Sequence, residues 1–219
     1  SNKGYFVCKF NFSHNGGTIH EPVDFHDLEA FAQNNYTKEL DDLGDILDWL
    51  FQDNNPFKSY FDKESITLIG HSRGGGIAII KASEDNRIKK LVTLAAVSDF
   101  KSRFPTGDEL INWKEKGVRY ILNGRTKQQM PHNYQFYINF LENESRLNIL
   151  EAEKRLNIPH IIIHGDNDEA VNVLDARKLK EVNPTAVLRI IKRANHTFGS
   201  YHPYDKEVLP EDFISCLNF

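Results

Sequence analysis

Short apolar runs of strand length alternate with longer amphipathic segments along most of this 219-residue chain. Strands that are apolar on both faces belong inside a parallel sheet, and repeated strand–helix–strand units place helices on both faces through right-handed crossovers. The alternation therefore predicts an α/β fold with a mostly parallel central sheet, in a single domain spanning residues 1–219. The strand-like runs are residues 5–12, 66–69, 91–97, 158–164 and 186–191.

The helical segments between these runs carry their own signals. Over residues 39–51, four leucines fall on one helical stripe with aspartates around it, and Thr37 is the expected N-cap. Further helices are expected over residues 77–82, 173–182 and 208–217. These helices supply the layers that cover the sheet.

The alternation breaks only between about residues 101 and 147. Residues 118–122 and 126–130 are strand-like and flank Asn123-Gly124, a strong hairpin signal, and a helix-like aromatic run follows over residues 134–141. We interpret this stretch as a cap-like or lid-like insertion in the domain. Its aromatic side chains either line an acyl pocket or anchor the insertion, and Tyr134 and Tyr137 are the candidates for substrate contact.

The charge balance narrows the class of partner. Lysine and arginine number 27 and aspartate and glutamate 31, a formal net charge of −4, without a block of like charges. This argues against nucleic acid or an anionic membrane and favours a small-molecule substrate, while the oligomeric state stays open. The apolar runs are too short for a membrane span and no signal pattern is present. With Cys8 and Cys216 expected as free thiols, these features favour the cytoplasm.

The most informative motif is Gly70-His71-Ser72-Arg73-Gly74, between a predicted strand and a predicted helix. A serine held at such a sharp turn exposes its hydroxyl, and the glycines two residues before and after it are expected to be pressed against neighbouring backbone. The helix N-terminus brings the backbone N–H of Arg73 to where the oxyanion of a tetrahedral intermediate forms. The pattern predicts that Ser72 is a nucleophile, the alternative being a glycine-rich turn without chemistry.

With this motif in this strand order, the chain resembles the α/β-hydrolase superfamily, and among its branches the dienelactone-hydrolase-like and cinnamoyl-esterase-like enzymes. The likeness to the catalytic domain of prolyl oligopeptidase is more distant. The resemblance implies a catalytic serine, acid and histidine, in that chain order, on loops after successive strands. It implies neither a metal nor an organic cofactor.

The acid is assigned through this resemblance. The loop after residues 158–164 reads His-Gly-Asp-Asn-Asp and is similar to the family's H-G-x-x-D loop, which assigns the acid to Asp168. From the residues alone, Asp166, Asp168 and Glu169 all stay open, because each could instead cap the following helix.

The histidine is assigned in the same way. The strand over residues 186–191 leads to His196, which the family's order makes the catalytic histidine. The chain's nine histidines contain no H-E-x-x-H motif, and His71 and His164 fill positions within the family's motifs that we interpret as structural.

The resemblance implies a serine hydrolase that cleaves small carboxylic esters through an acyl-enzyme. One alternative is a serine peptidase of the prolyl-oligopeptidase type, although such relatives commonly add a propeller domain that this length does not accommodate. A second is a non-catalytic binding protein on a hydrolase scaffold. The presence of all three triad candidates on separate loops counts against it.

One expectation concerns the beginning of the sheet. In the family, a further strand lies between those matching residues 5–12 and 66–69, and the loop after it supplies the second oxyanion donor. The few residues before Tyr5 are too short to form it. We therefore expect the N-terminal strands to be missing from this chain and a strand, loop and helix to precede it in the native protein. Direct pairing of residues 7–10 with residues 67–69 would contradict this expectation.

Overall fold

The computed structural model describes residues 4–21, 24–124, 126–201 and 203–217, which form two compact units. The first unit contains Ser1–Lys63 and Lys101–Leu147, and the second contains Glu64–Phe100 and Asn148–Phe219. The expected insertion therefore has the same bounds as the second segment of the first unit. The single-domain organisation stays a prediction.

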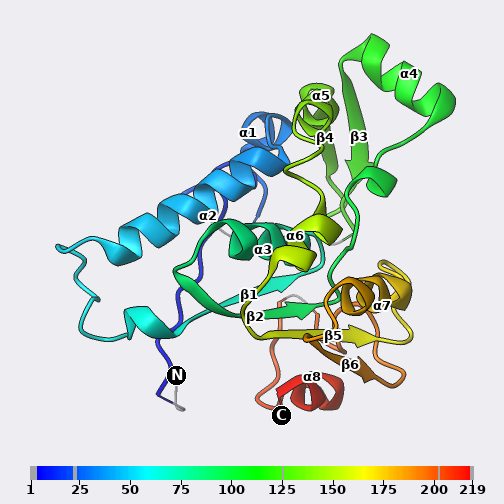
Figure 1. The fold of residues 1–219 in the computed structure, drawn as a ribbon. Helices are drawn as coiled ribbons and strands as arrows, with labels where there is room; N and C mark the ends of the chain where they lie inside the picture. Colours follow the sequence, from blue (N-terminus) through cyan, green and yellow to red (C-terminus); the bar gives the residue numbers. More distant parts are fainter. Residues whose placement is uncertain (1–3, 22–23, 125, 202, 218–219) are drawn as a thin grey trace. The chain divides into compact units, whose positions relative to one another are not determined.

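The second unit is built on a four-stranded sheet of order β1-β2-β5-β6 (Figure 1). Each neighbouring pair is parallel, which confirms the α/β class and the mostly parallel sheet. Because the strands are parallel, their carboxyl ends lie at one edge of the sheet. The strands are β1 (Ile66–His71), β2 (Ile88–Leu94), β5 (His160–Gly165) and β6 (Val187–Ile191).

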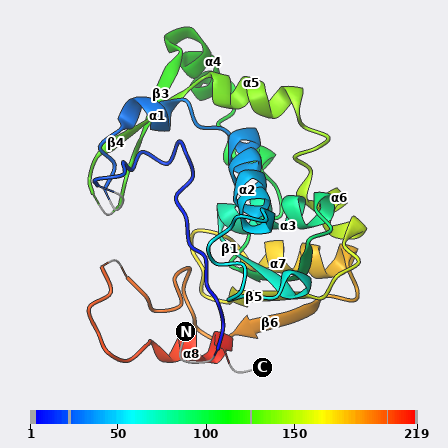
Figure 2. The same ribbon diagram turned by 90° about the vertical axis from the view of Figure 1, so that its left-hand side faces the viewer.

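Helices cover both faces of this sheet, as Figures 1 and 2 show. One face carries α3 (Arg73–Glu84), α6 (Ile149–Arg155) and α7 (Val173–Val182), and the other carries α8 (Glu211–Leu217). The core on the α8 side is made by Ala95, Ile163, Ala194, Phe198 and Cys216. Burial raises the pKa of the Cys216 thiol to about 11, and both Cys8 and Cys216 are free.

Glycines let α3 lie unusually close to the strands. A Cβ built on Gly70 would come within 2.4 Å of the carbonyl oxygen of Gly74, and one on Gly75 within 2.5 Å of the Cβ of Ala96. A Cβ on Gly74 would meet nothing within 4 Å. The expectation that both flanking glycines of the motif are pressed against backbone is therefore confirmed for Gly70 and wrong for Gly74, because the close contact on the helix side falls one residue later.

A buried polar network joins the strands to the helices of this unit. The Oε1 atom of Glu153 accepts hydrogen bonds from His160 Nδ1 at 2.9 Å and Asn183 Nδ2 at 2.7 Å. The other ring nitrogen of His160 lies 2.9 Å from the Thr93 hydroxyl. These contacts connect α6, β5, β2 and the end of α7. They also offset part of the cost of burying polar side chains, which is high when such groups are unpaired.

The first unit combines a hairpin with helices around an aromatic cluster. Its elements are η2 (Lys101–Arg103), α1 (Leu28–Ala32), α2 (Tyr36–Phe51), α4 (Gly107–Lys116), β3 (Val118–Leu122), β4 (Gln129–Asn133) and α5 (Gln135–Glu142), and η1 (Lys63–Ser65) spans the boundary with the second unit. The N-cap of α2 is Asn35, whose side chain accepts from the N–H of Lys38, and not Thr37. Thr37 lies inside the helix and donates its hydroxyl to Asn35.

The predicted hairpin forms with a later second strand. Strand β3 has the expected bounds, but β4 begins at Gln129 because Asn123 pairs its N–H with the carbonyl of Gln128. The connection therefore uses more residues than the Asn123-Gly124 signal implies.

The prediction of a buried strand over residues 5–12 is wrong. These residues form no strand, and Tyr5 and Val7 are 72% and 64% exposed. The aromatic rings instead pack locally, with Phe6 resting 5.3 Å from Phe61 between ring centroids. Aromatic side chains can contact each other in this way without a strand ladder, so the apolar run gave a misleading signal.

We predict that Gly75→Ala destabilises the protein and that Gly74→Ala does not. The added methyl group in Gly75→Ala has to displace Ala96, so the free energy of unfolding should fall by about 1–3 kcal/mol. Gly74→Ala should leave it unchanged or raise it by up to about 1 kcal/mol through helix propensity. Urea unfolding followed by circular dichroism measures both, and equal stability of the two variants would contradict the close contact.

Candidate active site

Three loops at the carboxyl edge of the parallel sheet bring the candidate residues together. Strand β1 leads directly into Ser72, β5 into the loop that carries Asp168, and β6 into the loop that carries His196. All three residues belong to the second unit. Side chains far apart in the sequence meet here because parallel strands end on the same side.

Ser72 occupies a strained turn between β1 and α3. Its φ is 55° and its ψ −124°, in a region that residues other than glycine rarely adopt. The turn is held because the N–H of Ser72 donates to Leu94 at 2.9 Å and its carbonyl accepts from Gly75 at 3.0 Å and from Val97 at 3.3 Å. Arg73 is the first residue of α3, so its backbone N–H points out of the helix N-terminus beside the serine.

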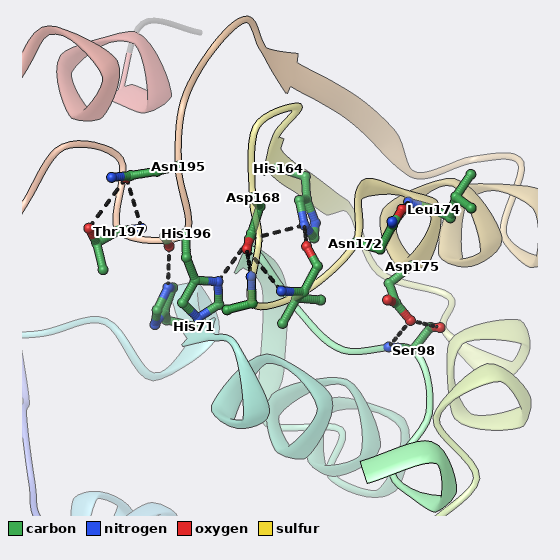
Figure 3. Close-up of polar contacts among 12 residues, drawn as sticks. His71, Ser98, His164, Asp168, Asn172, Leu174, Asp175, Asn195, His196 and Thr197 are labelled. Carbon is green, nitrogen blue, oxygen red and sulfur yellow. Dashed lines mark hydrogen bonds and ion pairs between the residues drawn. The ribbon is translucent and has the colours of Figure 1, made fainter. Parts of the chain in front are cut away.

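Asp168 and His196 form a hydrogen-bonded pair (Figure 3). Nδ1 of His196 lies 2.8 Å from Oδ2 of Asp168, whose side chain is fully buried while that of His196 is 23% exposed. Because an ionised carboxylate only accepts hydrogen bonds, Nδ1 carries the proton and Nε2 is left as the basic nitrogen. The sequence-predicted acid and histidine are thus brought together, whereas no hydrogen bond from the Ser72 hydroxyl is present among the described residues.

Hydrogen bonds keep Asp168 ionised. Burial by itself would raise the pKa of this carboxyl group, but the N–H of Val171, the ring of His196 and the N–H of Ala170 outweigh it and hold the pKa below its usual value. Both backbone groups donate to Oδ1 at 2.9 Å. The carboxylate is therefore available to His196 throughout the neutral pH range.

The neighbouring acid of the same loop is used differently. Oδ1 of Asp166 accepts a hydrogen bond from the backbone N–H of Arg193, and the side chain of Asp166 ties two loops together. Glu169 is exposed and lines the cleft that contains His196. Of the three acids left open by the sequence, Asp168 is the one that contacts His196.

Two further histidines reach this pair, and sequence reasoning had treated both as structural. Nε2 of His164 lies 2.9 Å from the carbonyl oxygen of Val171 and 3.3 Å from Oδ2 of Asp168, and its side chain is fully buried. Nε2 of His71 lies 2.8 Å from the backbone oxygen of His196. Their positions, near the end of β5 and directly before Ser72, were the sequence signals of these contacts.

A cleft of about 420 Å³ opens beside His196. It lies between the acid loop and the histidine loop and is lined by Asn167, Glu169, Ala170, Asn195, His196 and Thr197. Five of these six lining residues carry polar side chains. Asn195 shapes one wall, because its side chain accepts from the N–H groups of Thr197 at 3.2 Å and Gly199 at 2.9 Å.

The two tyrosines proposed for substrate contact belong to the first unit. Tyr134 packs edge-on against Trp113 at 5.6 Å between ring centroids, and Tyr137 lies 6.2 Å from the same ring. Both are half-buried in the aromatic cluster of that unit.

Two further properties of the described residues concern a metal site and a membrane-spanning helix. They contain no group of three or more histidine, cysteine, aspartate or glutamate side chains placed to hold a metal ion. No helix in the described part of the chain is long and apolar enough to cross a membrane.

A strained serine between a strand and a helix, with an acid and a histidine on the loops after later strands of a parallel sheet, is typical of an α/β hydrolase. The family model described as "alpha/beta hydrolase fold" matches residues 1–154, so the chain belongs to this family of hydrolases, as the resemblance implied. The comparisons do not select the dienelactone-hydrolase-like branch.

Similar proteins share this fold at low identity. The chain is 24% identical to the non-heme chloroperoxidase CPO-A1 of Kitasatospora aureofaciens over 89% of this chain and 76% of that protein. A solved putative hydrolase from Agrobacterium vitis S4 is 21% identical with a TM-score of 0.63, covering 86% of this chain and 68% of the other. Est1E from Butyrivibrio proteoclasticus, solved with ferulic acid bound, is 17% identical with a TM-score of 0.58, covering 86% and 67%.

The chain is shorter than several structures that it matches. It spans 62% of the esterase domain from a Rhodothermus marinus protein and 64% of Est1E in a second structure. At these identities the likeness to solved structures establishes the fold.

We predict that His71 titrates below its ordinary pKa and makes the stability pH-dependent. Burial lowers the pKa of His71 and the neighbouring His196 lowers it further, while the hydrogen bond to the His196 carbonyl opposes them; Asp168 and His164 are the other charges that face it. Between its folded value and about 6.5 the unfolded chain binds more protons, so stability rises with pH across this window and falls on acidification through it.

His71→Gln should therefore flatten the decline of the melting temperature as the pH is lowered from about 6.5. His26→Gln, which changes an exposed histidine of the first unit, is the matched control and should retain the wild-type slope. Thermal unfolding across a pH series measures both variants, and an unchanged slope in His71→Gln would contradict the lowered pKa.

Proposed function

We propose that this protein is a serine hydrolase that cleaves small carboxylic esters, with Ser72, His196 and Asp168 as its catalytic residues. The observation that carries the proposal is the 2.8 Å bond between His196 Nδ1 and the buried Asp168, on the sheet edge where Ser72 adopts its strained turn. An acid that fixes the histidine tautomer and leaves Nε2 basic is what a serine nucleophile requires.

In the proposed reaction, Nε2 of His196 takes the hydroxyl proton of Ser72 as Oγ attacks the ester carbonyl carbon. The carbonyl π electrons move to the oxygen, and the backbone N–H of Arg73 stabilises that oxyanion. As the intermediate collapses, the bond to the alcohol oxygen breaks, and the alcohol leaves with the proton from His196. Water then attacks the acyl-enzyme with His196 as base, releasing the carboxylic acid and restoring Ser72.

Two further features support a small ester substrate. The cleft beside His196 provides space where the alcohol can leave, because that side chain returns the proton. Tyr134 and Tyr137 are proposed as contacts for the acyl group, since half-buried aromatic rings offer apolar surface with a polar hydroxyl.

Two alternative functions would give different experimental results. A serine peptidase uses the same residues but prefers amide substrates, whereas a binding protein on a hydrolase scaffold leaves Ser72 unreactive. The buried and ionised Asp168 argues against the binding protein. Burying a carboxylate is costly, and a protein without catalysis gains nothing from the contact with His196 that would offset this cost.

We predict that the wild-type protein hydrolyses p-nitrophenyl butyrate and that a fluorophosphonate probe labels Ser72. Ser72→Ala should abolish labelling and nearly all turnover without unfolding the protein, because the side chain adds no packing to the core. Mass spectrometry of the labelled peptide, ester kinetics and circular dichroism measure these outcomes.

Ser83→Ala, which removes a hydroxyl from the far end of α3, is the control and should keep both the labelling of Ser72 and the ester turnover. Absence of labelling in the wild type would refute the serine-hydrolase proposal. A higher kcat/KM on aminoacyl p-nitroanilides than on the ester would replace the esterase with the peptidase.

We predict that Asp168→Asn lowers kcat on the order of 10⁴-fold, because the amide no longer holds the His196 tautomer with its basic Nε2 outward. Asp166→Asn is the matched variant in the same loop and should be much less damaging, since that side chain contacts the Arg193 backbone. Steady-state kinetics on the same ester compare the two, and the reverse order of damage would assign the acid to Asp166.

A further inference from the structure

His71 is the last residue of β1 and directly precedes Ser72 in the chain. The residue keeps solvent exposure although its ring lies against the His196 ring, so the core of the sheet does not depend on it. One planar peptide bond separates His71 from Ser72. A group that is hydrogen-bonded to the His71 side chain is therefore restrained in its distance from Ser72.

The group that it holds is the backbone of His196, 125 residues further along the chain (Figure 3). Nε2 of His71 lies 2.8 Å from the carbonyl oxygen of His196. Since a carbonyl oxygen only accepts, Nε2 of His71 carries the proton and donates. The two imidazole rings also face each other, with centroids 4.7 Å apart and planes inclined by 47°.

These contacts complete the restraints on the His196 side chain. Asp168 holds the ring at Nδ1, but that bond alone leaves the ring free to pivot about the Nδ1–Oδ2 direction. The donor from His71 restrains the backbone from which the ring extends, and the His71 ring limits motion of the imidazole on one side. Misplacement of a catalytic group by about 1 Å can cost about 10²-fold in rate.

We propose that His71 is a positioning residue, whose Nε2–H holds the loop of His196 against the turn that carries Ser72 so that the basic nitrogen stays aligned with the nucleophile. This inference rests on the proposed function, because it assigns His71 a part in the same reaction. His71 itself exchanges no proton with the substrate.

Three substitutions separate the hydrogen bond from the ring contact. His71→Gln keeps an amide donor near the position of Nε2 and removes the ring, His71→Phe keeps a ring and removes the donor, and His71→Ala removes both. His26→Gln serves again as the histidine control, because His26 belongs to the first unit.

On p-nitrophenyl butyrate, we expect kcat to fall about tenfold in His71→Phe and His71→Ala, the equivalent of one lost neutral hydrogen bond, with KM nearly unchanged. His71→Gln should recover most of that loss, and His26→Gln should match the wild type. A merely structural role would lower the folded fraction instead, which circular dichroism detects, and if His71→Ala unfolds, the comparison of Gln with Phe decides.

Proton NMR gives a readout that does not depend on turnover. The strongly hydrogen-bonded Nδ1 proton of His196 should resonate far downfield in Ser72→Ala, remain in Ser72→Ala combined with His71→Gln, and broaden or disappear when combined with His71→Ala or His71→Phe.

The proposal is overturned if His71→Ala keeps the wild-type kcat, or if His71→Gln is as slow as His71→Phe. These results are distinct from a failure of the proposed function, in which the wild type itself neither hydrolyses the ester nor reacts with the fluorophosphonate. If the wild type shows neither activity, the NMR experiment still tests the positioning role. That role is overturned if the downfield Nδ1 proton of His196 is retained in every His71 variant.

Discussion

The close approach of α3 to the sheet is the contact on which the site depends. Only a residue without a side chain fits where Gly75 meets Ala96 and where Gly70 faces the first turn of the helix. This approach forces the chain to turn sharply between β1 and α3, and Ser72 takes the strained φ at that turn. The strain is compensated by backbone hydrogen bonds to the neighbouring strand and its loop.

Around this turn, burial requires the polar groups to be paired. The Asp168 side chain is removed from water, two backbone N–H groups donate to its Oδ1 atom, and His196 donates to its Oδ2 atom, with His164 3.3 Å from the same oxygen. Because a buried carboxylate is tolerated only when its hydrogen-bonding capacity is used, the same contacts that make it stable also orient His196. The buried Glu153 follows this rule only in part, because its Oε1 atom accepts from His160 and Asn183 while its Oε2 atom has no hydrogen-bond partner.

Where the sequence misled, a local pattern had more than one physical solution. The aromatic run at residues 5–12 satisfied the pattern of a buried strand, yet its rings make aromatic contacts without strand pairing and none of these residues is buried. Thr37 and Asn35 are both good N-caps, and the helix begins where the Asn35 side chain reaches the N–H of Lys38. In the glycine run after Ser72, spacing alone did not reveal which residue meets the neighbouring loop.

The sequence by itself determined the parallel α/β architecture, the turn at Ser72 and the order of the candidate residues, because hydrophobic period and glycine spacing act over short stretches of chain. The residues alone left Asp166 and Asp168 open, and the resemblance pointed to Asp168. Only the tertiary structure showed the Asp168 carboxylate against His196 and brought His71 and His164 to the same pair. These contacts join loops separated by up to 125 residues. Their geometry is set by strand register and loop packing, which no local pattern encodes.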